Sequence, residues 1–242
     1  MQTVHSEWGL AGVETLRSHV GVLVIVDVLS FSTAVDIAVG RGGIIFPFPY
    51  GDAEAAHAAA SGRNAILASP RNAGGGQFSL SPRSLLDLQA GTRLMLPSPN
   101  GSRLSLAGGT VIVLAGCLRN AAAVAVEARR LANGADIGVI PAGERWSDGS
   151  LRPAIEDLLG AGAIIDALDL PLTPEARVAR DAWRAAVPDL DAIIRGCRSG
   201  QELIGWGYAD DVGLALAVGT SDLAPILRDG AYQPPPTKSL AP

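Results

Sequence analysis

The sequence contains few cysteines and aromatic residues, and no basic run interleaved with aromatic residues. Its two cysteines, Cys117 and Cys197, lie far apart and form no C-x-x-C pair. This count excludes a disulfide framework and favours structural thiols over a metal or redox site. With 19 basic and 24 acidic side chains the net charge is −5, so we expect no nucleic-acid partner.

Export and membrane signals are missing as well. Residues 1–19 (MQTVHSEWGLAGVETLRSH) contain neither a basic n-region nor an apolar h-region, so no signal peptide is predicted. Asp27 interrupts the longest apolar run well before the roughly 20 residues that a membrane span requires. We therefore expect a cytoplasmic protein with no membrane partner, and leave a homo-oligomer open.

Short β-branched runs alternate with alanine-rich stretches along the first 150 residues. The expected strands are 20–26, 43–48, 65–69, 93–96, 110–115 and 137–141. The expected helices between them are 32–39, 52–60 and 120–132, each with a polar or acidic start and a glycine near its end. Such βαβ alternation predicts an α/β fold with helices covering a mostly parallel sheet.

After Arg152 the alternation of strand and helix signals gives way to mostly helical signals. Residues 154–168, 174–187, 189–197 and 209–218 all favour helix, and a strand signal returns only at 223–227. No linker separates the two parts, so we expect one α/β domain over 1–230, helix-rich from about residue 152. Residues 231–242 (AYQPPPTKSLAP) are expected to form a flexible tail. The glycine-rich stretch 70–82 is expected to be a loop, either a binding or lid segment or a disordered insertion.

Polar side chains gather where these strands end. Ligands of parallel α/β sheets bind outside the carboxyl ends of the strands, so we expect these side chains to share one rim. The candidate substrate-binding residues are Ser30, Ser32, Thr33, Ser98, Asn100, Gly101, Ser102, Arg119 and Asn120. The candidate carboxylates are Asp27, Glu144, Glu156 and Asp157.

This set indicates phosphate and Mg²⁺ chemistry. Hydroxyl and amide groups before helices suit an oxyanion, and Arg119 could clamp it. Carboxylates would repel that oxyanion unless a hard cation intervened, and Mg²⁺ prefers oxygen ligands shared with phosphate. We expect Asp27, Glu144, Glu156 and Asp157 to hold Mg²⁺, with Asp27, Glu144 and Asp157 acting in catalysis. No P-loop is present, and because Asp27 is followed by Val28 and Leu29 it lacks the second acid of the D-x-D pair that haloacid-dehalogenase phosphatases use.

Each of these residues also has a plain structural interpretation. Ser32 and Thr33 could cap a helix, and Ser98–Ser102 could form a turn followed by a cap. Arg119 could pair with Glu156 or Asp157, and Glu144 could simply be solvated. Their joint occurrence on consecutive strand ends favours a site.

Seven segments in this order resemble the 2-phosphosulfolactate phosphatase family. They are VIVDVLSFSTAV (24–35), SPNGS (98–102), GCLRNAAAVA (116–125), PAGE (141–144), AIEDLLGAGAII (154–165), SGQELIGWGYADDV (199–212) and LAPILRDG (223–230). The resemblance implies a three-layer α/β/α fold and Mg²⁺-dependent release of phosphate from 2-phosphosulfolactate, a step of coenzyme M-type sulfonate pathways.

The chain departs from the family pattern at the first motif, usually D-V-L-R-A-S-T, where Ser30 and Phe31 replace Arg and Ala. It departs again at Ser69-Pro70-Arg71 for G-E-R and at Leu80 in the N-S-P segment. These changes leave open a different substrate or a non-catalytic anion-binding homologue. Arg71 or Arg83 could replace the missing arginine if the glycine-rich loop folds over the site.

Overall fold

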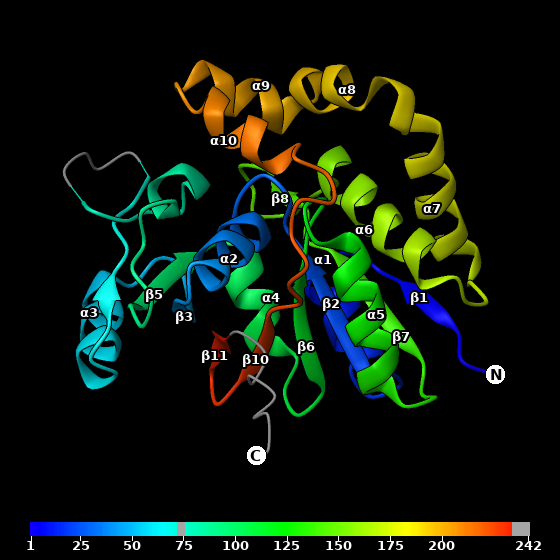
Figure 1. Ribbon diagram of the computed structural model, residues 1–242, viewed down its shortest axis with the longest axis horizontal. Coiled ribbons are helices and arrows are strands. Elements are labelled where there is room, and N and C mark those ends of the chain that lie inside the picture. Colours follow the sequence, from blue (N-terminus) through cyan, green and yellow to red (C-terminus); the bar gives the residue numbers. More distant parts are fainter. Residues whose placement is uncertain (72–75, 234–242) are drawn as a thin grey trace, which may run out of the picture.

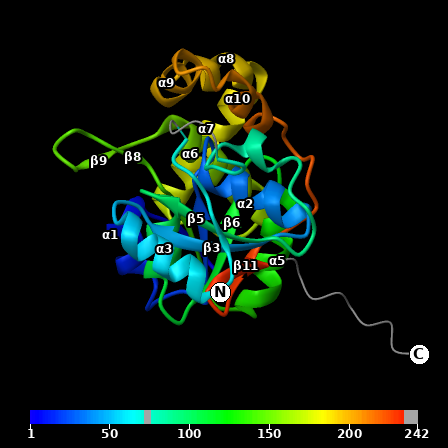
Figure 2. The ribbon, with the colours of Figure 1, turned by 90° about the vertical axis from the view of Figure 1, so that its left-hand side faces the viewer.

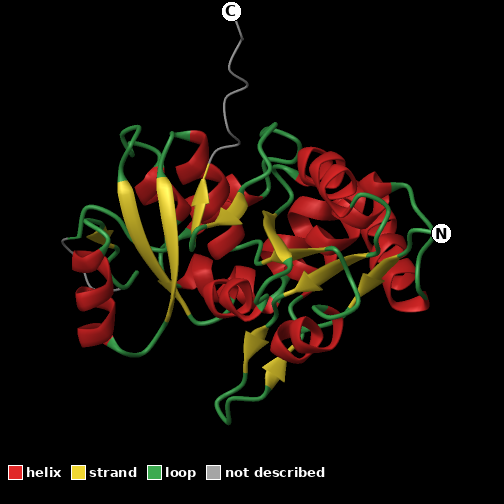
Figure 3. Cartoon of the chain, turned by 90° about the horizontal axis from the view of Figure 1, so that it is seen from below, coloured by secondary structure: helices red, strands yellow, loops and turns green. Residues whose placement is uncertain are grey.

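A computed structural model describes residues 1–71 and 76–233 of the chain (Figure 1). Within these residues one sheet holds nine strands in the order β1-β7-β2-β6-β10-β11-β3-β5-β4. Helices cover both faces of the sheet, which confirms the predicted three-layer α/β/α fold (Figure 3).

Seven strands of the large sheet overlap the predicted positions, whereas β1 and β11 were not predicted. The strands of this sheet are β1 (Val4–Ser6), β2 (Val22–Val26), β3 (Ile44–Pro49), β4 (Ile66–Leu67), β5 (Arg93–Ser98), β6 (Ile112–Gly116), β7 (Ile137–Pro141), β10 (Ile226–Arg228) and β11 (Ala231–Gln233). A separate hairpin consists of β8 (Glu144–Arg145) and β9 (Leu151–Arg152) and protrudes from the body of the molecule (Figure 2).

Alternate residues of the central strand β2 enter two different cores. Val22, Val24 and Val26 pack in the first core, with α5 (Ala121–Ala132), α6 (Ile155–Leu168) and α7 (Pro174–Ala186). Leu23 and Ile25 pack in the second core, with α1 (Gly9–Leu16), α2 (Phe31–Gly40) and α4 (Gly101–Ala107). Because successive side chains of a strand point to opposite faces, a strand covered on both sides is apolar throughout.

The remaining helices lie at the ends and edges of the sheet. They are α3 (Ala53–Gly62), η1 (Pro82–Leu85), η2 (Val187–Asp189), α8 (Leu190–Gly196), α9 (Arg198–Gly205) and α10 (Ala209–Ala215). Figure 1 shows α8, α9 and α10 grouped together at the end of the molecule where β8 lies. The helix-rich last third therefore supplies both a layer on the sheet and a cap over one end.

The sheet consists of two parallel groups of strands joined by an antiparallel hairpin. Strands β1, β7, β2 and β6 pair in parallel, as do β3, β5 and β4. The β10–β11 hairpin connects the groups through the antiparallel pairs Ile226↔Leu114 and Tyr232↔Ile45. Adjacent strands rotate by about 20–25° per step, and this twist accumulates over the five steps from β2 to β5. The carboxyl ends of β2 and β5 can therefore meet despite the antiparallel connection.

Two expectations about the chain termini need correction. Residues 231–233, predicted to begin the flexible tail, form β11, and Tyr232 is fully buried there with its hydroxyl 2.7 Å from Ser105 Oγ. The rest of that predicted tail, 234–242, lies outside the described residues. The N-terminal segment, for which no element was predicted, forms β1 and α1.

Candidate active site

Asp27 follows β2 and lies between the first amides of two helices. One carboxylate oxygen accepts a hydrogen bond from Phe31 N at 3.2 Å, and the other accepts one from Gly101 N at 3.0 Å. These amides begin α2 and α4, which we expected to bind an oxyanion of the substrate. Asp27 itself is the anion that they bind, and it is only 6% exposed.

Gly101 is required where α4 meets α2. A Cβ atom at this position would overlap the ring of Phe31. The absence of a side chain therefore lets the Gly101 amide approach Asp27 and ties the end of β5 to the end of β2.

Ser32 and Thr33 hold the turn between β2 and α2. Ser32 Oγ accepts from Asp27 N and donates to the carbonyl of Ile25, both at 3.0 Å. Thr33 Oγ1 donates to the carbonyl of Val28 at 2.6 Å. Both side chains are fully buried, so they shape the site instead of facing a substrate.

Asp157, at the start of α6, links the ends of β2 and β7 through hydrogen bonds to their following backbone amides. Its carboxylate accepts hydrogen bonds from Val28 N at 2.7 Å and from Gly143 N at 2.9 Å. Burial raises the pKa of Asp157 well above its ordinary value, and the charges of Asp27 and Glu156 raise it further.

Glu144, in β8, supplies the other carboxylate of the site. Its Oε2 accepts a hydrogen bond from Asn100 Nδ2 at 2.9 Å. Burial raises the pKa of Glu144 above its ordinary value. Burial raises the pKa of Asp27 to about 7, and the charge of Glu144 is the next largest cause. The site thus concentrates negative charge in a buried place, which a cation would relieve.

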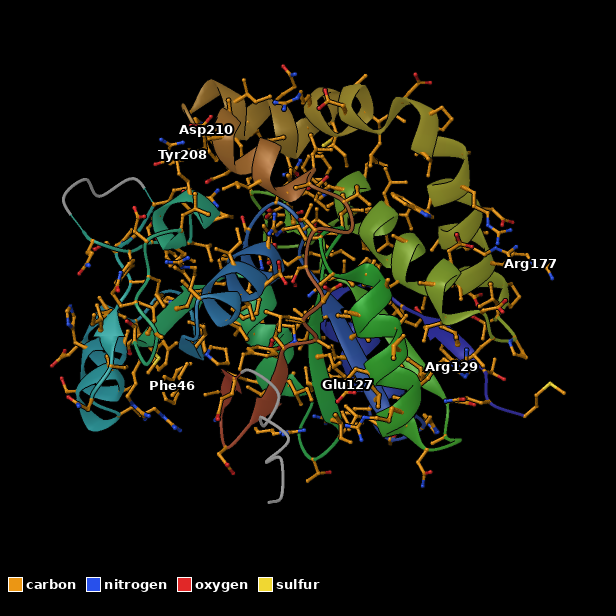
Figure 4. All side chains as sticks on the ribbon, in the orientation of Figure 1. Phe46, Glu127, Arg129, Arg177, Tyr208 and Asp210 are labelled. Atoms are coloured by element: carbon orange, nitrogen blue, oxygen red, sulfur yellow. The ribbon has the colours of Figure 1, made fainter. Side chains whose placement is uncertain are left out.

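Ser30 and Glu144 open into a pocket of about 380 Å³ under α9. Arg71 reaches this pocket from the glycine-rich loop, and its Nη2 donates to Ser30 Oγ at 3.3 Å. A guanidinium group therefore lies beside position 30, as we expected if the loop folds over the site. Arg83 does not line this pocket and forms an exposed ion pair of 2.6 Å with Asp210, whose position Figure 4 shows. Within the predicted loop, residues 72–75 lie outside the described residues.

The remaining predicted residues have structural contacts. Arg119 Nε lies 2.8 Å from Asp36 Oδ2, so its ion pair is with Asp36 and not with Glu156 or Asp157. The other contacts are Ser98 Oγ with Asn100 N, Ser102 Oγ with the Leu96 carbonyl, Asn120 with Cys117 N and the Ala115 carbonyl, and Glu156 with Cys197 Sγ. The structure therefore brings together Asp27, Ser30, Asn100, Gly101, Glu144 and Asp157 from the predicted set.

The carboxylates do not form a closed metal cluster. Within residues 1–71 and 76–233, no three His, Cys, Asp or Glu side chains are placed to hold a metal ion together. Mg²⁺ in phosphoryl-transfer sites commonly uses one or two carboxylates and takes its other ligands from water and the substrate phosphate. Asp27 and Glu144 fit such a site, because Asp27 is buried, Glu144 is half-buried, both have raised pKa values and their charges repel one another.

Arg152, in β9, is a pocket residue that the sequence analysis missed. It is the direct cross-strand partner of Glu144 and is 7% exposed. A signal was available, because Asp148-Gly149 between two short apolar-polar runs is typical of a hairpin turn. The structure has a three-residue turn over 147–149, and this register places Arg152 opposite Glu144, whereas a two-residue turn at Asp148-Gly149 would have placed it opposite Arg145.

Comparison with known proteins identifies a family for this chain. The family model described as 2-phosphosulpholactate phosphatase matches residues 12–230. The chain is 32% identical over 219 residues to the 2-phosphosulfolactate phosphatase of Methanothermobacter thermautotrophicus, covering 88% of this chain and 89% of that protein. It is 25% identical over 140 residues to the probable 2-phosphosulfolactate phosphatase of Pseudothermotoga lettingae, covering 57% and 59% respectively.

In the described part of the chain no helix is long and apolar enough to cross a membrane.

The matched residues 12–230 include β2 and β5, whose ends form the site, and the β10–β11 connection up to its turn. Because the match covers most of the fold and every site residue, the chain belongs to the 2-phosphosulpholactate phosphatase family.

Proposed function

We propose that this protein is a phosphatase that hydrolyses a small anionic phosphomonoester, 2-phosphosulfolactate by relation to the Methanothermobacter enzyme, in a Mg²⁺-dependent reaction. The observation that carries the proposal is the pair of carboxylates formed by buried Asp27 and half-buried Glu144, of which Glu144 lines an arginine-rich pocket. Carboxylates beside guanidinium groups suit a phosphate ester held through a cation on one side and through arginine on the other.

The two carboxylates have different surroundings and hence different tasks. Asp27 is fixed by two backbone amides, so its orientation changes little when substrate binds. Without a cation its pKa is about 7, so a bound Mg²⁺ would displace the proton of Asp27 near neutral pH. Glu144 is fixed on one oxygen by Asn100, which leaves the other oxygen to face a ligand.

Mg²⁺ would be held by Asp27 and Glu144 together with the phosphate of the substrate. There it would withdraw charge from the phosphoryl oxygens and lower the pKa of a bound water. Asp157 supports this arrangement from behind, because it holds the backbone at Val28 and Gly143, one residue away from each of the two carboxylates.

Phosphate release from 2-phosphosulfolactate, with and without Mg²⁺, tests this proposal. We expect turnover in the presence of Mg²⁺, its loss in EDTA, and a loss of at least about 100-fold in kcat for Asp27→Asn, because a metal ion supplies several kcal/mol of transition-state stabilisation. The matched control is Asp166→Asn, which changes an aspartate of α6 that pairs with Arg184. Phosphate binding without release from any phosphomonoester would instead identify a non-catalytic anion-binding homologue.

A further inference from the structure

One segment that carries the family resemblance has no role in the proposed function. Residues 199–212 (SGQELIGWGYADDV) form α9, the turn after it and the start of α10. Two polar side chains near the end of this segment, Tyr208 and Asp211, contact the glycine-rich loop at Arg71. These contacts connect the helical cap with an arginine that lies beside the reaction centre.

Asp211 is almost completely buried, with 1% of its surface exposed. Its Oδ1 accepts hydrogen bonds from Ser81 Oγ at 2.7 Å and from Arg83 N at 3.0 Å, at the start of η1. Its Oδ2 has no hydrogen-bond partner among the described residues and lies 3.8 Å from Arg71 Nη2. Because a buried carboxylate requires a compensating charge, Arg71 is the counter-ion of Asp211. η1 therefore fixes one oxygen of Asp211 and leaves the other to act on Arg71.

Tyr208, the residue before α10, contacts the same arginine twice (Figure 4). Its hydroxyl donates to the Arg71 carbonyl at 2.6 Å. The Arg71 guanidinium carbon also lies 5.2 Å from the centroid of the Tyr208 ring, within the distance at which an aromatic face attracts a cation. The first contact fixes the backbone of position 71, and the second fixes its side chain.

The guanidinium group that these residues hold reaches into the site. Its Nη2 donates to Ser30 Oγ at 3.3 Å and to the Leu80 carbonyl at 3.1 Å, and its Nε is buried without a partner in the part of the chain that the structure describes. Burial lowers the pKa of Arg71, and the charges of Asp211 and Asp27 are the main influences in the opposite direction. Arg71 is thus a cation held between Asp211 on one side and a carboxylate of the reaction centre on the other.

An arginine on a loop gains from such support before the substrate arrives. Arginine has one of the most flexible side chains, and a ligand that must immobilise it loses affinity. A guanidinium group that is already fixed binds an anion without that loss. In phosphoryl transfer, an arginine placed in this way stabilises the charge on the phosphoryl oxygens.

We propose that Asp211 is a positioning residue of the reaction, which holds the Arg71 guanidinium toward the phosphoryl group bound at Asp27, with Tyr208 in a supporting role. This inference rests on the proposed function. Asp211 does not touch the substrate and acts through Arg71 alone, so its effect must disappear when Arg71 is removed.

A double-mutant cycle of Asp211→Asn and Arg71→Gln, with the affinity for inorganic phosphate in Mg²⁺ measured by calorimetry, tests the inference without requiring turnover. Asparagine retains an oxygen for Ser81 and Arg83 but removes the charge beside Arg71. We expect Arg71→Gln to weaken phosphate binding about 10- to 100-fold and Asp211→Asn about 3- to 10-fold. In the Arg71→Gln background, Asp211→Asn should change the affinity by less than about 2-fold. The kcat/KM for 2-phosphosulfolactate should show the same non-additivity.

Asp210→Asn is the matched control. Asp210 is the neighbouring aspartate of α10 and pairs with the exposed side chain of Arg83 on the same loop, so its replacement should leave phosphate affinity unchanged (Figure 4). Tyr208→Phe provides a second variant if Asp211→Asn fails to fold, because it retains the ring and removes only the hydroxyl. We expect it to weaken phosphate binding about 2- to 10-fold, again only while Arg71 is present.

Equal losses of phosphate affinity with and without Arg71 would overturn the inference, because Asp211 would then support only the fold. Tighter phosphate binding by Asp211→Asn would overturn it as well, since Asp211 would then compete with phosphate for Arg71. Phosphate binding that depends on Asp211 through Arg71, without phosphate release from any monoester, would refute the proposed function and leave this inference standing.

Discussion

Replacing Asp27 with asparagine should stabilise the metal-free protein at alkaline pH. The pKa of Asp27 is raised from 3.8 to about 7, so the folded chain retains a proton that the unfolded chain has lost. Stability therefore falls as pH rises from about 4 to 7, and the full penalty of about 4 kcal/mol is present above pH 7. Asparagine removes this charge but cannot accept hydrogen bonds from both Phe31 N and Gly101 N, which costs about 1–3 kcal/mol.

The two effects oppose each other and depend differently on pH. At pH 8 in EDTA we expect Asp27→Asn to be more stable than wild type by about 1–3 kcal/mol. For a chain of this size that corresponds to a rise in Tm of about 2–10 °C. At pH 4.5, where Asp27 is largely protonated in the wild type, the variant should be no more stable than wild type.

Thermal unfolding monitored by circular dichroism at both pH values measures the difference in stability between Asp27→Asn and the wild type. Millimolar Mg²⁺ should raise the Tm of the wild type at pH 8, because a ligand that binds only the folded state stabilises it by mass action, and should have no effect on the variant. Asp36→Asn is the control, since it leaves Arg119 without its buried partner and should destabilise at both pH values. Equal destabilisation of Asp27→Asn at pH 4.5 and pH 8 would refute the reasoning.

Two further predictions concern packing and ion pairing. Arg119→Ala should leave the phosphate affinity measured by calorimetry unchanged. It should lower the free energy of unfolding in urea by about 3–5 kcal/mol, because it leaves Asp36 as a buried unpaired charge. Weaker phosphate binding would show instead that Arg119 contacts the ligand. Gly162→Ala should lower stability by about 1–3 kcal/mol, because its Cβ would overlap the Ala179 carbonyl where α6 meets α7. Gly62→Ala, with open space around the new Cβ, is its control, and equal Tm values for both variants would contradict this account.

The strands and the position of Asp27 could be predicted because their signals are local. A strand buried on both faces has a continuous apolar run, and the residue after it lies at the edge of the sheet. β2 and β7 follow this rule, and both lead directly into site residues. The helix following β2 was found for the same reason, since its glycine and polar start are visible in the sequence.

Contacts between distant segments could not be predicted in this way. Arg119 follows β6 as a ligand-binding arginine would, but its partner Asp36 lies on α2 and nothing local to either residue indicates the pair. Tyr232 precedes three prolines, which suggested a tail, whereas its burial against Ser105 depends on the tertiary fold. Arg152 acquires its position only through a hairpin whose strands have two residues each, too short for a periodic signal.

The order in which the chain is synthesised has a consequence for folding. The β10–β11 hairpin that joins the two parallel groups comes after every other strand in the sequence. A nascent chain that ends before residue 226 therefore exposes the unpaired edges of β6 and β3, which can pair with other chains. Asp27 and Gly101 follow strands of different parallel groups, so we expect their hydrogen bond to form only after the β10–β11 hairpin has paired with β6 and β3. Ribosome-bound chains of increasing length should remain sensitive to proteases until the hairpin emerges.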